Sequence, residues 1–481
     1  MLFRSEYGIF PYLYNADDNA FTFIENVLTE VMQLFPSQYI HIGGDEAIKD
    51  QWKASATIQA QMKTLGIHDE DALQSYFIKR IDTFLTAHGR RTIGWDEILQ
   101  GGLAPHAAVM SWHGVDGGIN AAKQGHDAVL TPVRPLYFNY RQSDAADEAP
   151  GRFALNTLEN VYSFNPLPDS LTADQKQHIL GVQGNLWSEY VISADRLEWM
   201  LYPRTAALAE IGWSAADRRD WNGFLPRMED EMSRYTLLGI RFDPAAFKVR
   251  SSESFAADHL HVTVNLSNQA AFGTIRYTTD GSPVTTSSQE YSAPLSMPLP
   301  SHLRAAAFSQ SEISSSELDR TLDQLSVRKR FSQEMKLCQN DPAIAMEPDP
   351  QQAERPVVLA NYVKPCWIYR AADMDSITSI SAGVVPLAYV FHDKNNKLPP
   401  LGTPHTPDGE LEVHLDRCEG PLVVALPLAP AAGHDDVTQL RATLAPLHGV
   451  HDLCLQVVRP HVDPLWVLDW VQLEPAGEPK P

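Results

Sequence analysis

Five short apolar segments in the first 245 residues each lead directly into polar or aromatic residues, and helix-like stretches separate them. The five segments are 39–42, 91–95, 107–112, 128–131 and 179–184. Strand-like segments that alternate with amphipathic helices predict an α/β sheet of parallel strands. The carboxyl ends of parallel strands meet at one edge of the sheet, so we expect a functional site there.

The helical patterns support this arrangement. Apolar residues recur at three- and four-residue intervals over about Asp71–His88, which predicts an amphipathic helix. An earlier helix is expected to begin with Asp18 or Asn19 as its N-cap, and a later one to cover Ala194–Leu208.

The number of strands favours an incomplete barrel. A closed (β/α)8 TIM barrel needs eight strands in about 250 residues, whereas five strand-like segments precede residue 245. We therefore expect residues 1–246 to form a partial TIM-barrel catalytic domain that lacks about its first three strands.

Farther along the chain, helical periodicity gives way to alternating apolar and polar residues. Alternation over 260–266 and the hairpin signal Asp280-Gly281 predict a small β-sandwich C-terminal domain over 248–326. A linker-like helix is expected around Ser326–Glu334. Later apolar segments predict a larger, carbohydrate-binding-like β-sandwich over 332–475.

The charge balance restricts the class of partner. The chain has 38 Lys and Arg against 60 Asp and Glu, a formal net charge of −22. This argues against nucleic acid or an anionic membrane surface as a partner. No apolar run approaches the roughly 20 residues of a membrane helix. The opening Met1–Glu6 is not followed by the apolar core of a signal peptide, so a periplasmic or secreted location would require an upstream leader.

The four cysteines, Cys338, Cys366, Cys418 and Cys454, all lie in the last third of the chain. Their spacings match no zinc motif, and we expect buried free thiols, with one or two disulfides as the alternative in an exported protein. We expect no cofactor and no metal ion.

The stretch Gly43-Gly44-Asp45-Glu46 is the strongest candidate for chemistry. Glycine adopts backbone angles that other residues avoid, so both acids could face one cleft. Two carboxylates held close together separate each other's pKa values, which gives an acid beside an anion. The simpler interpretation of Asp45 and Glu46 is that they are two neighbouring acids on a solvated surface. The same four residues also open the diguanylate cyclase signature, but Ala47 follows where that signature has an aromatic residue.

Several short motifs occur in one order along the chain. They are His41–Glu46, Gly94–Glu97, Ser111-Trp112, Thr131-Pro132 with Tyr137, and Asn185–Glu189. Together, over about residues 7–240, they resemble the β-N-acetylhexosaminidases of glycoside hydrolase family 20. The resemblance implies an exo-acting hydrolase that removes terminal β-linked N-acetylglucosamine or N-acetylgalactosamine from oligosaccharides or glycoconjugates. In that family the 2-acetamido oxygen of the substrate is the nucleophile.

The resemblance also implies roles for individual residues. Glu46 would be the general acid and then the general base, while Asp45 would orient the acetamido group and stabilise the oxazolinium intermediate. Tyr137 would donate a hydrogen bond to the acetamido oxygen. The implied substrate-binding residues are Trp95, Trp112, Asn139, Trp187 and Glu189.

Two departures from the family pattern favour an alternative. Asn139 stands where an aspartate is usual, which implies a changed hydroxyl preference. The arginine that the family carries on its first barrel strand has no counterpart. The alternative is therefore a catalytically inactive, truncated homologue or a carbohydrate-binding protein.

Asp96 and Glu97 are interpreted as a charge pair at a helix N-terminus.

Overall fold

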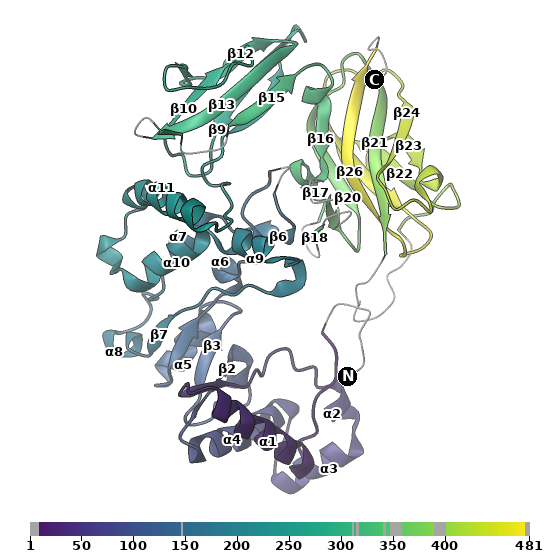
Figure 1. Ribbon diagram of the computed structural model, residues 1–481. Helices are drawn as coiled ribbons and strands as arrows, with labels where there is room; N and C mark the ends of the chain where they lie inside the picture. The colour runs from purple at the N-terminus through teal and green to yellow at the C-terminus, as the bar shows by residue number, and fades with distance from the viewer. Residues whose placement is uncertain are drawn as a thin grey trace. The chain divides into compact units, whose positions relative to one another are not determined.

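A computed structural model describes residues 9–145, 148–309, 312–313, 317–339, 343–346, 358–388 and 401–476 (Figure 1). The chain divides into two compact units. The first consists of residues 1–138, 160–186 and 207–219, and the second of residues 139–159, 187–206 and 220–481. Among the described residues, no helix combines the length and the apolar character needed to cross a membrane.

A five-stranded parallel sheet forms the centre of the first unit. Its strands, in spatial order, are β1 (Tyr39–His41), β2 (Arg91–Trp95), β3 (Ala108–Ser111), β4 (Ala128–Leu130) and β7 (Ile179–Val182). Every neighbouring pair is parallel, and spatial order follows chain order. The predicted parallel α/β arrangement is therefore confirmed.

Helices connect these strands and cover the sheet. The helices that lie wholly in the first unit are α1 (Asp18–Leu34), α2 (Asp50–Ala54), α3 (Ala56–Leu65), α4 (Glu70–Ala87), α5 (Asp116–Lys123), α6 (Val133–Leu136) and α8 (Ala173–Lys176). Phe21 and Leu28 of α1 pack with Ile40 of β1 and with Leu85 of α4. The N-cap of α1 is Asp17, whose Oδ1 accepts the Ala20 N–H at 2.9 Å, and not Asp18 or Asn19 as predicted.

Two helix predictions are wrong. The predicted helix over Ala194–Leu208 is two helices, α9 (Ala194–Leu201) and α10 (Arg204–Trp213). Pro203 separates them because proline has no N–H to donate and disfavours helical angles in the residue before it. The predicted helix around Ser326–Glu334 consists of two single 3-10 turns on either side of strand β16 (Lys329–Phe331).

Two sheets and a shared apolar core follow helix α11 (Trp221–Leu238) in the second unit. One sheet has the order β12 (Leu295–Pro298), β9 (His261–Ser267), β8 (Arg250–Phe255). The other has the order β11 (Gln289–Glu290), β10 (Thr274–Thr278), β13 (Ser301–Ser309), β14 (Glu312–Ile313), with β15 (Leu318–Leu322) also paired to β13. Val262, Val264 and Leu303 belong to the buried cluster that both sheets supply.

A larger pair of sheets lies farther along the chain in the second unit. One has the order β16, β26 (Leu465–Pro475), β21 (Ile377–Leu387), β24 (Thr438–Thr443). The other has the order β17 (Lys336–Leu337), β20 (Cys366–Asp373), β25 (Val450–Val458), β22 (Glu410–Leu415), β23 (Leu422–Pro427). Trp367, Leu455 and Val467 lie in the core that the two sheets share. The region after residue 247 is therefore β-rich, as predicted.

A separate sheet joins distant parts of the chain. Its order is β19 (Val358–Asn361), β18 (Ala343–Met346), β6 (Gly151–Leu155), β5 (Tyr140–Arg141). Strand β18 pairs antiparallel with β6, where Ala345 lies opposite Gly151. Residues 139–159 consequently belong to the second unit, although the strands on either side of them in the chain belong to the first.

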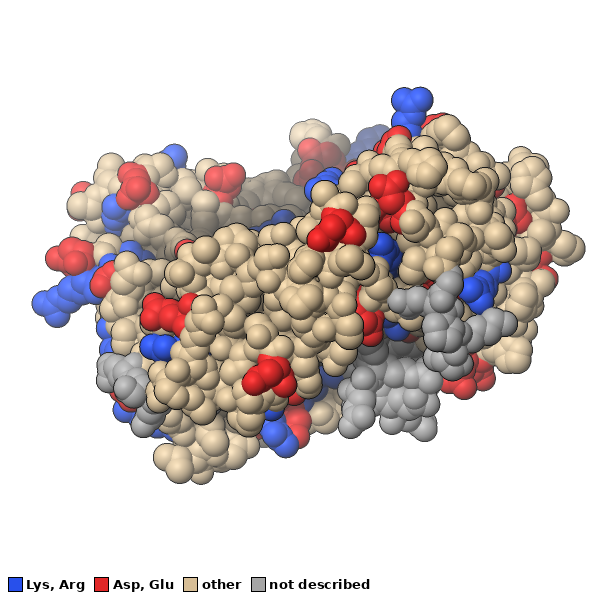
Figure 2. Space-filling view, turned by 90° about the horizontal axis from the view of Figure 1, so that it is seen from above, with Lys and Arg blue, Asp and Glu red and all other residues tan. Residues whose placement is uncertain are grey.

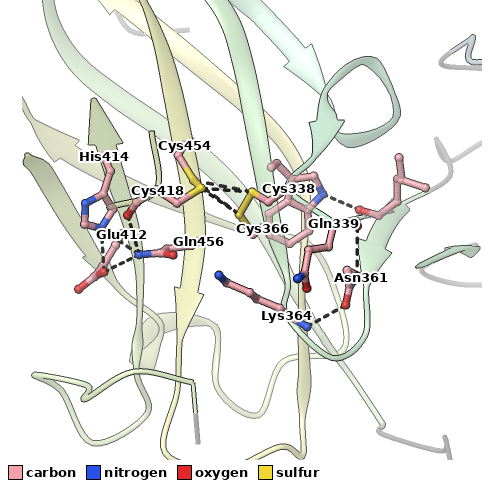
Figure 3. The surroundings of a disulfide bond; sticks show 12 residues. Cys338, Gln339, Asn361, Lys364, Cys366, Glu412, His414, Cys418, Cys454 and Gln456 are labelled. Carbon is pink, nitrogen blue, oxygen red and sulfur yellow. Dashed lines mark hydrogen bonds and ion pairs between the residues drawn. A yellow bond between two sulfur atoms is a disulfide. The ribbon is translucent and has the colours of Figure 1, made fainter. Parts of the chain in front are cut away.

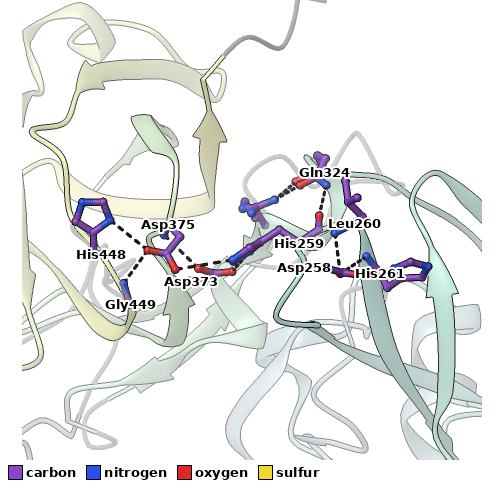
Figure 4. Close-up of polar contacts among 10 residues, drawn as sticks. Asp258, His259, Leu260, His261, Gln324, Asp373, Asp375, His448 and Gly449 are labelled. Atoms are coloured by element: carbon purple, nitrogen blue, oxygen red, sulfur yellow. Dashed lines mark hydrogen bonds and ion pairs between the residues drawn. The ribbon is translucent and has the colours of Figure 1, made fainter.

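An ion-pair cluster connects the small and the large β-sheet pairs of the second unit (Figure 4). His259 Nδ1 lies 2.9 Å from Asp373 Oδ2, and His259 Nε2 lies 3.8 Å from Asp375 Oδ2. Asp375 Oδ1 also accepts the Gly449 N–H at 3.0 Å. This backbone donor, with His448 beside it, lowers the pKa of Asp375.

A second polar network lies at the amino ends of the parallel strands. Asp127 precedes β4, and its carboxylate binds Tyr39 Oη at 3.3 Å, Arg91 Nη1 at 2.8 Å and His178 Nδ1 at 3.1 Å. Burial raises the pKa of Asp127, but the hydrogen bonds from His178 and Arg91 outweigh it and hold the pKa below its usual value. The network joins strands β1, β2, β4 and β7 at the edge opposite Asp45 and Glu46.

The expectation of free cysteines is wrong. Cys338 is bonded to Cys366, and Cys418 to Cys454, so none of the four is free. The alternative weighed from the sequence, two disulfides, is the arrangement observed.

Candidate active site

The loop that follows β1 has an unusual backbone. Gly43 and Gly44 have φ angles of +76° and +100°, and Glu46 has a φ of +49°. The Gly43 carbonyl accepts the Trp95 N–H at 3.0 Å, which fixes the loop against the end of β2. A Cβ on Gly44 would lie 2.6 Å from Ile98 Cγ2. Position 44 therefore requires glycine both for its angles and for space.

Asp45 and Glu46 project from this loop with exposed side chains. A left-handed backbone is costly for glutamate and persists where surrounding contacts hold it. Here the Glu46 N–H donates to Glu97 Oε1 at 3.2 Å. The candidate acid thus sits on a constrained backbone and still faces solvent.

His41, the last residue of β1, lies beside the two acids. Its ring contacts the Trp95 ring with 4.8 Å between centroids. The Gly43 N–H donates to His41 Nδ1 at 3.1 Å, so the neutral ring carries its proton on Nε2. Desolvation lowers the pKa of His41, and the Asp45 carboxylate partly opposes this shift. The ring therefore favours the neutral form.

Asp96 and Glu97 occupy the first turn of the 3-10 helix η1 (Asp96–Leu99), directly after β2, and both are buried. Glu97 Oε2 accepts the Trp112 indole N–H at 3.0 Å, while Oε1 accepts the Glu46 N–H. Asp96 accepts from Ser111 Oγ at 3.3 Å and contacts His113 Nδ1 at 2.9 Å. The two acids therefore connect the loops after three successive strands, a role beyond that of a helix charge pair.

Sequence reasoning did not assign this role to Glu97. The available signal was its place two residues after the tryptophan that ends a strand.

Trp112 and Tyr137 form an aromatic pair after β3 and β4. Their ring centroids lie 6.4 Å apart and their planes differ by 19°. The Trp112 carbonyl accepts the Val133 N–H at 2.7 Å, and the Phe138 N–H donates to the Asn185 carbonyl at 2.6 Å. These backbone contacts anchor both ends of the segment that carries Tyr137, whose side chain is buried.

The predicted site residues are divided between the units. Asp45, Glu46, Trp112 and Tyr137 follow β1, β3 and β4 of the first unit, and Trp95 ends β2. Glu46, Trp112 and Tyr137 are linked through the contacts above. The second unit contains Asn139, Trp187 and Glu189. Asn139 is fully buried, whereas Trp187 and Glu189 are exposed near the 3-10 helix η2 (Ser188–Tyr190).

Asp96, Glu97 and His113 lie close enough together to suggest a metal centre, with their ligand atoms within 4.8 Å of one another. Their oxygens already accept hydrogen bonds from Ser111, Trp112 and the Glu46 backbone. These contacts account for the cluster as a hydrogen-bonded network.

Charge and cavity volume do not by themselves identify the site. Acidic and basic side chains are interspersed over the face shown in Figure 2. A cavity of about 600 Å³ in the second unit is lined by Arg141, Arg330, Tyr369 and other residues, but by none of the predicted site residues. The candidate site therefore rests on the geometry of the strand-end loops.

Comparisons with known proteins bear on the same region. Residues 4–216 match the model of the glycosyl hydrolase family 20 catalytic domain, and residues 255–318 match that of the chitobiase/beta-hexosaminidase C-terminal domain. A beta-hexosaminidase of Porphyromonas gingivalis is 42% identical over 282 residues, which cover 58% of this chain and 36% of that protein. A beta-hexosaminidase of Vibrio furnissii is 36% identical over 196 residues, which cover 40% of this chain and 32% of that protein.

A solved structure is also similar over part of its length. It is the GH20 exo beta-N-acetylglucosaminidase from Vibrio harveyi in complex with N-acetylglucosamine, with 32% identity and a TM-score of 0.45. The match covers 48% of this chain and 36% of that one. The chain thus spans about a third of the length of these relatives.

Proposed function

We propose that the chain is an exo-acting hydrolase of terminal β-linked N-acetylglucosamine or N-acetylgalactosamine, because residues 4–216 match the model of the glycosyl hydrolase family 20 catalytic domain. The observation that carries the proposal is the constrained Asp45-Glu46 loop, which exposes two carboxyl groups and is connected through Glu97 to Trp112 of the aromatic pair. We propose further that the five parallel strands correspond to the last five of an eight-stranded barrel. The proposed domains cover 1–246, 248–326 and 332–475.

In the proposed mechanism, Glu46 donates its proton to the glycosidic oxygen as the bond to C1 breaks. The acetamido carbonyl oxygen of the substrate attacks C1 from the opposite face and forms an oxazolinium ring. Asp45 accepts the acetamido N–H and stabilises the positive charge that develops. Glu46, now ionised, takes a proton from the water that attacks C1, so two inversions give net retention.

The aromatic residues have a matching role in this proposal. Trp112 and Tyr137, with nearly parallel rings, provide an apolar surface for the acetamido methyl group. The Tyr137 hydroxyl donates to the acetamido oxygen and so holds it in line with C1. Trp95 extends the apolar wall, while Asn139, Trp187 and Glu189 are proposed to bind sugar hydroxyls.

The first experiment compares Glu46→Gln with Glu30→Gln, which changes an exposed glutamate of α1. On 4-nitrophenyl N-acetyl-β-glucosaminide we expect kcat/KM to fall by at least about 100-fold in Glu46→Gln, the effect of losing a general acid and base. We expect no change in Glu30→Gln. Full activity in Glu46→Gln would contradict the proposal.

A second experiment tests the nucleophile. A trifluoroacetamido substrate has a less nucleophilic carbonyl oxygen, so the wild-type chain should hydrolyse it far more slowly than the acetamido substrate. Equal rates would instead indicate a nucleophile supplied by the protein. Binding of the sugar without turnover would favour a carbohydrate-binding role.

A further inference from the structure

All four cysteines converge on one point of the larger β-sheet pair, although 116 residues separate the first from the last (Figure 3). The two disulfides also lie close to each other: all four distances between a sulfur of one disulfide and a sulfur of the other are short. Cys338 Sγ lies 3.4 Å from Cys418 Sγ and 3.8 Å from Cys454 Sγ. Cys366 Sγ lies 3.5 Å from each of the same two sulfurs. Each sulfur thus contacts the other three.

The cluster joins four segments of a single sheet. Cys338 directly follows β17, Cys366 begins β20, Cys454 lies in β25, and Cys418 lies in the turn between β22 and β23. Backbone pairing fixes three of these positions, because Cys338 N–H donates to the Cys366 carbonyl and Ile368 lies opposite Cys454. Cys366 and Cys454 are buried, while Cys338 and Cys418 are half-buried. Strands and one turn therefore build the site, and two of its four sulfurs belong to half-buried residues.

The arrangement has the dimensions of a four-thiolate metal centre. A tetrahedral zinc site has Zn–S bonds of about 2.3 Å, which places its sulfurs about 3.8 Å apart. The four distances between sulfurs of different disulfides, 3.4–3.8 Å, are within about 0.4 Å of that value. The largest change needed is the separation of the two bonded pairs when their disulfides are reduced. Four thiolates form a soft donor set that selects zinc over magnesium or calcium.

We propose that these cysteines form a redox-dependent metal site that binds one Zn²⁺ when both disulfides are reduced. Two equivalents of a dithiol reduce the two disulfides to four thiols and are themselves oxidised to disulfides. One Zn²⁺ then replaces the four thiol protons, which are released to solvent. The same four segments are cross-linked in either state, by sulfur–sulfur bonds or through the metal.

The experiment uses the full chain, reduced with a phosphine and freed of metal. Addition of Co²⁺ should give sulfur-to-cobalt charge-transfer absorption and the visible bands of tetrahedral cobalt, saturating at one ion per chain. Zn²⁺ should abolish these bands. Titration with a thiol reagent should find about four reactive thiols without metal and almost none with Zn²⁺.

Two controls keep the result specific. The first control is Cys418→Ser, which removes the ligand in the turn and should weaken cobalt binding and alter the absorption bands. The second control is the wild-type chain with both disulfides intact, which should show no charge-transfer absorption. Coordination through His259, Asp373 and Asp375, whose ligand atoms also lie together, would give no sulfur absorption. Absence of the charge-transfer bands in the reduced wild-type chain, or thiols that stay reactive with Zn²⁺ present, would overturn the proposal. Both readouts apply to the wild-type chain, so a Cys418→Ser chain that failed to fold would not affect the decision.

Discussion

Replacing Glu97 with glutamine should destabilise the first unit and disorganise the candidate site. The Glu97 carboxylate, 8% exposed, accepts the Trp112 indole N–H at 3.0 Å and the Glu46 N–H at 3.2 Å. An amide has a single acceptor oxygen, so in the variant one of these donors must face an NH2 group. A hydrogen bond to a charged group contributes about 1.5–3 kcal/mol. We therefore expect the free energy of unfolding to fall by about 2 kcal/mol.

Urea unfolding monitored by tryptophan fluorescence measures this change, with Glu30→Gln as the matched control. A double-mutant cycle with Trp112→Phe tests the indole contact, since phenylalanine keeps an aromatic side chain, smaller than indole, but has no N–H. The coupling energy should be about 1–2 kcal/mol. Hydrolysis should fall as well, because the backbone of Glu46 loses its anchor.

Two results would refute this reasoning. One is a Glu97→Gln chain whose unfolding free energy lies within about 0.5 kcal/mol of the wild type, the range of ordinary surface substitutions. The other is a cycle in which the effects of the two substitutions simply add.

Three further predictions follow from the same structure. Gly44→Ala should reduce stability and hydrolysis far more than Gly66→Ala, which also has a positive φ but meets no atom within 4 Å; equal losses would exclude the clash with Ile98. The lowered pKa of Asp127 contributes stability that is present above its unfolded value of about 3.9 and is lost as pH falls through the lowered folded value. Asp127→Asn should therefore flatten the acid side of the stability–pH curve, and an unchanged curve would contradict the network. Asn139→Asp should lower the Tm at pH 7, because it places a charge at a fully buried position, and should regain stability on acidification; a loss independent of pH would refute this.

The parallel sheet was predictable from the sequence because its signals are local. Each strand is a short apolar run, and each is followed by the residues that project from its carboxyl end. The residues that follow β1, β2 and β3 could be grouped for the same reason, since parallel strands bring those ends to one edge.

Contacts between loops were not predictable in the same way. Glu97 links Glu46 and Trp112, which lie 51 and 15 residues away in the chain, and no periodicity encodes such a link. The cysteines show the same limit, because spacings along the chain do not reveal that β20 and β25 are neighbours. The break between α9 and α10, in contrast, was readable from Pro203, because proline has no N–H to donate and disfavours helical angles in the residue before it.

The pairing of β6 with β18 has a consequence for how the chain can be divided. The two strands are about 190 residues apart in the chain, yet Gly151 and Ala345 are direct neighbours in the sheet. A shortened chain that ended near residue 246 would leave β6 with an unpaired edge, which is a site for aggregation. Contacts between residues so far apart in the chain also slow folding, because the entropy of closing a long loop is lost before the contact forms. The C-terminal part of the chain therefore completes the sheet that contains β6, a strand within the region that matches the family 20 catalytic-domain model.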